Sequence, residues 1–125
     1  MTNVKKEKGD KFERAVLNTI QDAPLAAYRT FNAGIPSDAG DIHIRASSNV
    51  VVQCKNVVRL NLAEWTTDAR RQANQAAQHA LENAVGVVVV KRRGHSNTAR
   101  SYVVCELGDF LTLIGRRPIN LKEQP

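Results

Sequence analysis

Apolar residues recur at helical spacing near the start of this chain. Within residues 8–23, Phe12, Val16 and Ile20 fall on one face of a helix. Pro24 follows directly, and a proline disfavours helical backbone at the residue before it. The pattern therefore predicts a helix that ends by Ala23.

A second helical pattern fills residues 61–83, which contain neither glycine nor proline. Its apolar face combines one tryptophan with a row of alanines, namely Trp65, Ala69, Ala73, Ala76, Ala77, Ala80 and Ala84. Because these side chains are mostly small, we expect a long helix that packs close against a sheet. We interpret this face as part of the core and not as a platform that stacks on bases.

The remaining apolar segments have the patterns of strands. DIHIR and NVVVQCK are separated by ASSN, which predicts an antiparallel hairpin, and LAAYRTF predicts a short strand before it. AVGVVVVKR and SYVVCEL predict two later strands, and GDFLTLIG predicts a short final helix. The order of these segments predicts an α/β fold in which helices flank a central mixed sheet.

Length and composition fit one compact domain with a basic surface. The 125 residues are enough for a single core, which we place at about residues 8–115, between a basic N-terminal tip and a loose C-terminal tail. Eighteen Lys and Arg residues against twelve Asp and Glu give a net charge of +6. This charge favours a polyanionic partner such as nucleic acid.

The apolar runs are too short to span a membrane, and both cysteines lie inside such runs. The longest run, VGVVVV, is far below the roughly 18 to 20 residues of a membrane span, and the N-terminus is polar, so we expect a cytoplasmic protein. Cys54 and Cys105 each lie in a strand pattern. We interpret them as buried free thiols and not as a disulfide or a metal site.

The predicted hairpin brings together side chains that can handle phosphate. Residues two apart in a strand share a face, so Gln53 and Lys55 are displayed together. If the apolar residues of both strands pack inward, Asp41 and His43 lie on the same face as this pair. A carboxylate, an amide oxygen and a backbone carbonyl are the hard oxygen ligands that Mg²⁺ accepts, and a lysine can orient water or support charge. This set indicates phosphodiester chemistry.

Three motifs give the chain a family resemblance. KGDKFERAV resembles the first-helix signature of the PD-(D/E)XK nuclease superfamily, in particular of the archaeal-type Holliday junction resolvases and their phage relatives. AGDIHI and VVVQCKN are similar to the family's metal-binding aspartate and its acid-x-lysine element. The matching positions are Glu13, Asp41, Gln53 and Lys55. The resemblance covers residues 8–106 and implies a restriction-endonuclease-like fold with an αβββαβ core.

The resemblance also implies a function and a cofactor. It implies a structure-selective DNA endonuclease that uses Mg²⁺, with Mn²⁺ as a possible substitute, and acts as a homodimer on four-way junctions. Asp41, Gln53 and the Cys54 backbone carbonyl would hold the metal, Glu13 would assist directly or through a water, and Lys55 would act on the attacking water. The expected cut leaves a 5′-phosphate.

One position departs from the family pattern. Gln53 stands where the family usually carries a carboxylate, so the site has one negative charge fewer and should bind metal more weakly. Asp38 or Glu13 is a candidate to supply that charge. Two alternatives therefore stay open: a restriction or repair nuclease that cuts ordinary duplex, and an inactive DNA-binding module with the same fold.

Contacts to the DNA backbone are assigned to basic and polar residues near these motifs. They should be sensitive to salt and largely indifferent to base sequence. Gln72 or Gln75, on the second helix, is a further polar candidate near the site. The candidate DNA-binding residues are Lys8, Lys11, Arg14, Arg29, Ser37, His43, Arg92 and Arg93, with a surface histidine as the alternative role for His43.

Overall fold

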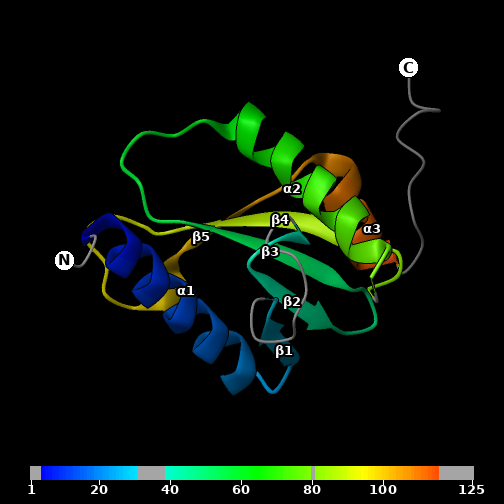
Figure 1. Ribbon diagram of the computed structural model, residues 1–125, viewed down its shortest axis with the longest axis horizontal. Coiled ribbons are helices and arrows are strands. Elements are labelled where there is room, and N and C mark those ends of the chain that lie inside the picture. Colours follow the sequence, from blue (N-terminus) through cyan, green and yellow to red (C-terminus); the bar gives the residue numbers. More distant parts are fainter. Residues whose placement is uncertain (1–3, 31–38, 80, 116–125) are drawn as a thin grey trace.

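The computed structural model describes residues 4–30, 39–79 and 81–115, in which helices surround one five-stranded sheet (Figure 1). The helices are α1 (Val4–Asp22), α2 (Leu62–Ala77) and α3 (Leu107–Gly115), with a short 3₁₀ helix η2 (Thr98–Arg100). The strands are β1 (Ala26–Arg29), β2 (Ile42–Arg45), β3 (Val50–Lys55), β4 (Val85–Val90) and β5 (Tyr102–Val104). This order confirms the predicted succession of helices and strands.

The sheet is mixed, as the sequence predicts. Its strand order is β1-β2-β3-β4-β5; among the described strands β3 and β4 pair in parallel, and the other neighbours are antiparallel. Parallel neighbours need a crossover connection, and α2 provides it. The predicted hairpin is the antiparallel pair β2–β3, in which Ile42 is opposite Val52 and His43 is opposite Val51.

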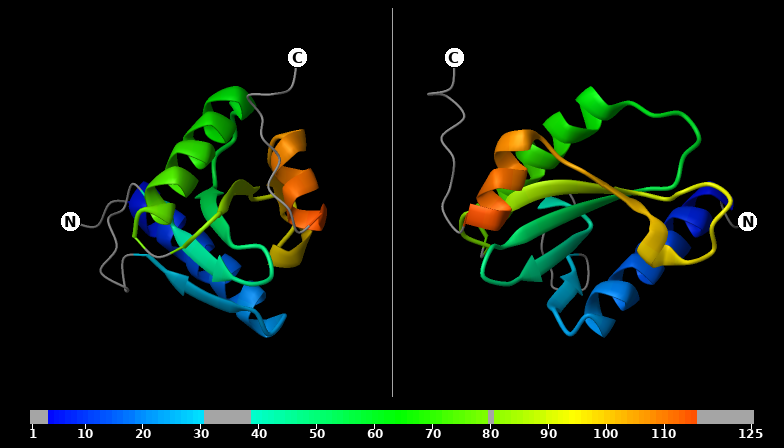
Figure 2. Two further views of the ribbon diagram at one scale, coloured as in Figure 1. Left: turned by 90° about the vertical axis from the view of Figure 1, so that its right-hand side faces the viewer. Right: turned by 180° about the vertical axis from the view of Figure 1, so that it is seen from behind.

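Apolar side chains fill both sides of the sheet. On one side α1 packs Phe12 and Val16 onto Ile42 and Val52. On the other side Trp65 and the alanines of α2 cover the sheet, as the apolar pattern of this helix predicts. Helices α1 and α2 therefore lie on opposite faces (Figure 2). The valines of β4 point alternately to the two sides, which is why this strand is a continuous apolar run.

The backbones of α2 and β4 approach each other closely at Gly86. A Cβ atom placed on Gly86 would lie 2.1 Å from the Ala69 carbonyl oxygen. No side chain fits in that space, because the nearest atoms all belong to the α2 backbone, so glycine is required on the strand. The small apolar face of α2 is the sequence feature that permits this contact.

The end of α2 differs from the prediction. The helix stops at Ala77 although the helical pattern extends to residue 83. After Ala77 the chain turns back, the Leu81 amide donates to the Ala76 carbonyl at 3.1 Å, and Leu81 is fully buried beside Val51. Asn83 then adopts a left-handed conformation with φ of 54°. Burial of Leu81 against the sheet outweighs further helical turns.

The C-terminal elements extend the structure beyond β4. Leu113 of α3 joins the apolar cluster on the α1 side, while Arg70 of α2 forms a 2.8 Å ion pair with Glu106 just before α3.

Cys54 and Cys105 are free thiols, as predicted, although both are only partly buried. None of the helices described is both long and apolar enough to cross a membrane.

The contact at Gly86 gives a stability prediction. Gly86→Ala should lower the free energy of unfolding by about 1–3 kcal/mol or more, because the added methyl group forces the α2 backbone away from β4. Gly9→Ala is the matched control: its new Cβ meets nothing within 4 Å, and alanine should stabilise the middle of α1 by about 0.5–1 kcal/mol. Urea denaturation measures both. Equal stability of Gly86→Ala and the wild type would contradict the close contact.

Candidate active site

The backbone around Asp41 is fixed between two strands. Gly40 has a φ of 95°, and a Cβ on it would lie 2.3 Å from a Val51 methyl carbon, so only glycine fits this turn. The Asp41 amide donates to the Val52 carbonyl at 2.9 Å, and the Asp41 carbonyl accepts from the Thr30 amide at 3.1 Å. These contacts hold the aspartate just before β2 begins.

The Asp41 carboxylate points toward β3. Its Oδ2 accepts a 2.8 Å hydrogen bond from the backbone amide of Cys54. Burial raises the pKa of the Asp41 carboxyl above its ordinary value, while this bond and the nearby charges of Lys55 and Arg29 act in the opposite direction. Burial, together with the charges of Asp41 and Glu13, also raises the pKa of the Cys54 thiol. The metal-ligand role of the Cys54 carbonyl stays a prediction.

Glu13 reaches the same region from α1 through an ion pair with β1. Arg29 approaches one Glu13 carboxylate oxygen with both Nε and Nη2 at 3.1 Å, and its Nη2 lies 3.8 Å from Asp10. Burial, followed by the charge of Asp41, raises the pKa of Glu13, while Arg29 lowers it. The fold thus brings Glu13 and Asp41 together as two partly buried carboxylates that repel each other.

Lys55 is held on the α2 side of the sheet. Its Nζ lies 5.7 Å from the centroid of the Trp65 ring on α2, a cation–π contact. Lys55 still acts on Asp41, since its charge lowers the pKa of that carboxyl. Gln53 is half-buried and pairs with Val88, which packs against Trp65, so Gln53 shares the Lys55 face as the strand pattern predicts.

The prediction that His43 contacts DNA is wrong, and so is its alternative as a surface histidine. The side chain is only 1% exposed. Its Nε2 lies 2.8 Å from the Ala39 carbonyl, and its Nδ1 lies 3.4 Å from the Tyr28 hydroxyl. His43 does face the α2 side of the sheet, as alternation requires, but that face is covered at this position. Burial lowers the pKa of His43.

The shared face of the Asp41 carboxylate with Gln53 and Lys55 stays a prediction. Asp41 directly precedes the first residue of β2 and so is not itself part of the strand. Its carboxylate accepts from the Cys54 amide and lies within electrostatic reach of both Glu13 and Lys55.

The other predicted DNA contacts divide into three groups. Arg29 is paired with Glu13 and Asp10, and Arg92 lies over the Tyr102 ring at 5.6 Å, so both guanidinium groups are engaged within the protein. Ser37 lies outside the described residues, and so does Asp38, the candidate to supply the charge that Gln53 lacks. The remaining predicted contacts, Lys8, Lys11, Arg14 and Arg93, are exposed, as a role in binding requires.

Sequence reasoning missed two neighbours of the site, Asp10 and the Trp65 ring, and named a third, Gln72. Asp10 precedes Glu13 by three residues, the spacing of one helix face, and this was the signal that could have found it. Trp65 was assigned to the core alone, but it also holds Lys55. Gln72 of α2, one of two polar candidates, is buried near Gly40.

The oxygen-rich site fits a divalent cation in its chemistry. Glu13 and Asp41 supply partly buried carboxylates whose ionised forms are disfavoured by burial, and a cation would favour those forms. Among residues 4–30, 39–79 and 81–115, no group of three or more His, Cys, Asp and Glu side chains is arranged to hold a metal. A metal would therefore need the Gln53 amide, backbone carbonyls or waters as further ligands.

Comparisons with known proteins leave the family open. No protein-family model matches this chain, and no curated protein sequence matches it significantly.

The raised pKa of Asp41 gives a pH-dependent prediction. A carboxyl whose pKa is raised by folding stabilises the fold when protonated and costs stability once pH rises through its folded pKa. Asp41→Asn should therefore be more stable than the wild type at pH 7, because it removes the buried charge and keeps an oxygen for the Cys54 amide. The advantage should vanish below about pH 4, where an unfolded aspartate is protonated.

Thermal melts of both proteins between pH 3.5 and 8 measure this effect. Asp68→Asn is the charge-matched control, because its carboxylate on α2 is well exposed and makes only a 3.9 Å pair with Arg71. We expect no pH-dependent gain from it. A wild type more stable than Asp41→Asn at pH 7 would show that the Asp41 charge stabilises the fold.

Proposed function

We propose that this chain is a metal-dependent DNA endonuclease with a restriction-endonuclease-like fold, and that it acts on branched DNA as a Holliday junction resolvase. The observation that carries the proposal is that Asp41 lies within electrostatic reach of both Glu13 on α1 and Lys55 on β3. This link through Asp41 supports one shared site. The order and pairing of β1 to β4 around α2 are consistent with the proposed fold.

The residues that would hold Mg²⁺ or Mn²⁺ are Asp41, Gln53, the Cys54 carbonyl and Glu13. When bound, the ion would polarise the scissile phosphate and offset its developing negative charge. The neutral Gln53 amide makes a weak cation site, because it adds an oxygen ligand without charge. Arg29 further reduces the negative charge through its pair with Glu13.

Lys55 is proposed as the group that positions the attacking water. An ammonium can donate hydrogen bonds to a water and to a phosphate oxygen, and its positive charge stabilises negative charge in the transition state. Its cation–π contact with Trp65 restricts the side chain. Arg29 plays a positioning role, since its two contacts to one oxygen fix the Glu13 carboxylate.

The homodimer is part of the same proposal. β5 is the last strand in the sheet order, and β5 and α3 both carry exposed apolar side chains, namely Tyr102, Val103, Leu107, Phe110, Leu111 and Ile114. Large exposed apolar surface is often a site of association. A second copy of this chain, pairing through β5 and α3, would cover part of this surface and place two sites on a two-fold substrate.

One rival function has a specific observation in its favour. Gln53 lacks the expected charge, and Arg29 already occupies one oxygen of Glu13. Both features suit a DNA-binding module that has lost catalysis. A nuclease that cuts ordinary duplex differs from the resolvase only in substrate.

Cleavage of a labelled four-way junction and of a matched linear duplex tests the proposal. With Mg²⁺ we expect paired nicks in the junction alone, and none with EDTA. Lys55→Ala should cut about 10²- to 10³-fold more slowly, because the charge and water contacts are lost, and should still bind the junction. Arg71→Ala is the control, since it removes an exposed positive charge on α2, away from the proposed site.

Each outcome separates the candidates. Equal cutting of junction and duplex would replace the resolvase with a general nuclease. Tight binding with no cutting in Mg²⁺ or Mn²⁺ would favour the inactive module. Unpaired single nicks, with a monomer in sedimentation equilibrium, would contradict the dimer.

A further inference from the structure

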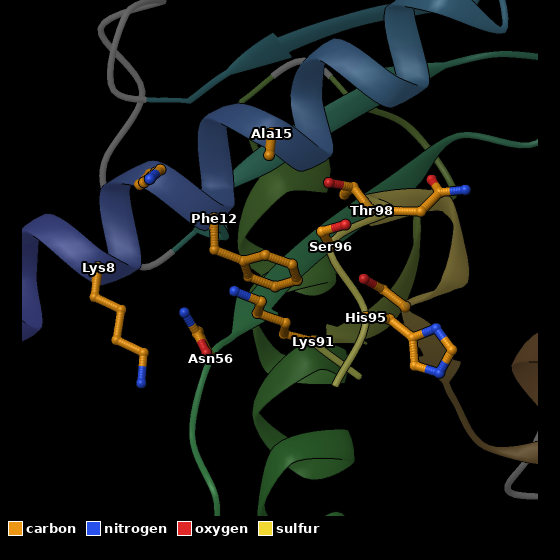
Figure 3. Close-up of a pocket in the computed structure, with 11 residues that line it drawn as sticks. Lys8, Phe12, Ala15, Asn56, Lys91, His95, Ser96 and Thr98 are labelled. Carbon is orange, nitrogen blue, oxygen red and sulfur yellow. The ribbon is translucent and has the colours of Figure 1, made fainter. Parts of the chain in front are cut away.

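A pocket built on the same two segments as the candidate active site contains two predicted DNA contacts, Lys8 and Lys11, and its other lining residues carry no assigned role. It has a volume of about 370 Å³ and lies between α1, the end of β3 and the loop from β4 to η2 (Figure 3). Eleven residues line it. Ligand pockets in proteins span roughly 300–1,000 Å³, so this one suits a small group such as one nucleotide unit. We name it the lysine pocket.

The chemistry of the lysine pocket selects for an anion. Its lining includes Lys8, Lys11 and Lys91, and contains no Asp or Glu. Within the described part of the chain, none of these three lysines takes part in an ion pair. Phe12 and Ala15 form an apolar wall, which strengthens the attraction between the ammonium groups and an anion.

Hydroxyl donors complete the pocket on its far side. Ser96, Thr98 and Ser101 line it from the loop and η2, and Figure 3 shows Ser96 and Thr98 across from Phe12. The loop is ordered by its own hydrogen bonds, since Asn97 caps η2 by accepting from the Ala99 amide at 3.0 Å. Ammonium and hydroxyl groups together are typical phosphate donors.

The lining also indicates which anion is recognised. It contains no arginine, so it lacks the planar fork that grips carboxylates in bidentate fashion. Lysines act as point charges and tolerate many phosphate orientations. This suits the repeating, sequence-independent backbone of nucleic acid.

The pocket and the carboxylate site are built on the same two segments. On α1, Phe12 lines the pocket while its neighbour Glu13 belongs to the carboxylate site. At the end of β3, Asn56 lines the pocket and directly follows Lys55. A strand that places one phosphate at Asp41 would therefore run past the lysine pocket with a neighbouring phosphate.

We propose that the lysine pocket binds a phosphate group of a nucleic-acid strand, beside the phosphate that is cut. The proposal rests on the proposed nuclease function for the identity of the strand and for its path. The phosphate is either an internal phosphodiester or the terminal phosphate of a strand end. Both present the same anionic oxygens to the three lysines.

Binding without cleavage tests the pocket separately from catalysis. Junction affinity is measured in EDTA over a range of salt concentrations for the wild type, Lys11→Gln, Ser96→Asp and Arg71→Gln. Lys11→Gln should make the negative slope of log K against log salt shallower by about 0.9, the value for one lost phosphate contact. Ser96→Asp should weaken binding more, because it adds a carboxylate to the pocket. Arg71→Gln removes the same charge outside the pocket and should leave the slope unchanged.

A second arm identifies the source of the phosphate. Oligothymidylates with and without a 5′-phosphate are compared for the wild type and Lys11→Gln. If the wild type prefers the phosphorylated strand and Lys11→Gln loses this preference, the pocket binds the terminal phosphate. If both strands bind equally and Lys11→Gln weakens both equally, the pocket binds an internal phosphodiester. If Lys11→Gln and Ser96→Asp bind the junction as tightly as Arg71→Gln does, the proposed phosphate pocket is wrong, even if Lys55→Ala abolishes cleavage.

If both pocket variants bind more weakly but the wild type cuts no DNA, the phosphate pocket stands and the proposed nuclease function is wrong.

Discussion

The contact between the backbones of α2 and β4 sets the geometry on which the rest of the structure depends. At Gly86 the helix lies so close to the strand that a single methyl group cannot be inserted. This spacing lets Trp65 pack onto β4 and lie beneath Lys55 at the end of β3. The same packing keeps Gln72 near the glycine turn before Asp41. A core made largely of alanine and valine thus serves to position polar groups at one end of the sheet.

The site that results is electrostatically costly. Glu13 and Asp41 are partly buried, which raises the pKa of both carboxyls, and the charge of Asp41 raises the pKa of Glu13 further. Arg29 and the Cys54 amide offset part of this cost without removing it, because the pKa values of both carboxyls stay raised. Groups held together against their own repulsion are common at functional sites. A bound cation would relieve that repulsion, which is the physical reason to place a metal here.

The sequence predicts the local elements well and the side-chain environments less well. Period-two and helical patterns are local, so the β2–β3 hairpin and the Trp65 face of α2 could be predicted directly. The end of α2 could not, because it depends on burial of Leu81 against a distant strand. The same holds for His43, which is covered by other segments, and for Arg29, whose partners lie on α1. The candidate site was predicted by family motifs, whereas the contacts that tune it are tertiary.

The central claim is that Glu13, Asp41 and Gln53 form a cation site, and Mn²⁺ titration by calorimetry in the absence of DNA tests it most directly. The wild type should bind Mn²⁺ weakly, Gln53→Glu should bind it at least tenfold more tightly because it adds a charged ligand, and Asp41→Asn should not bind it. Equal binding by the wild type and Asp41→Asn, or no binding by either the wild type or Gln53→Glu, would contradict the account.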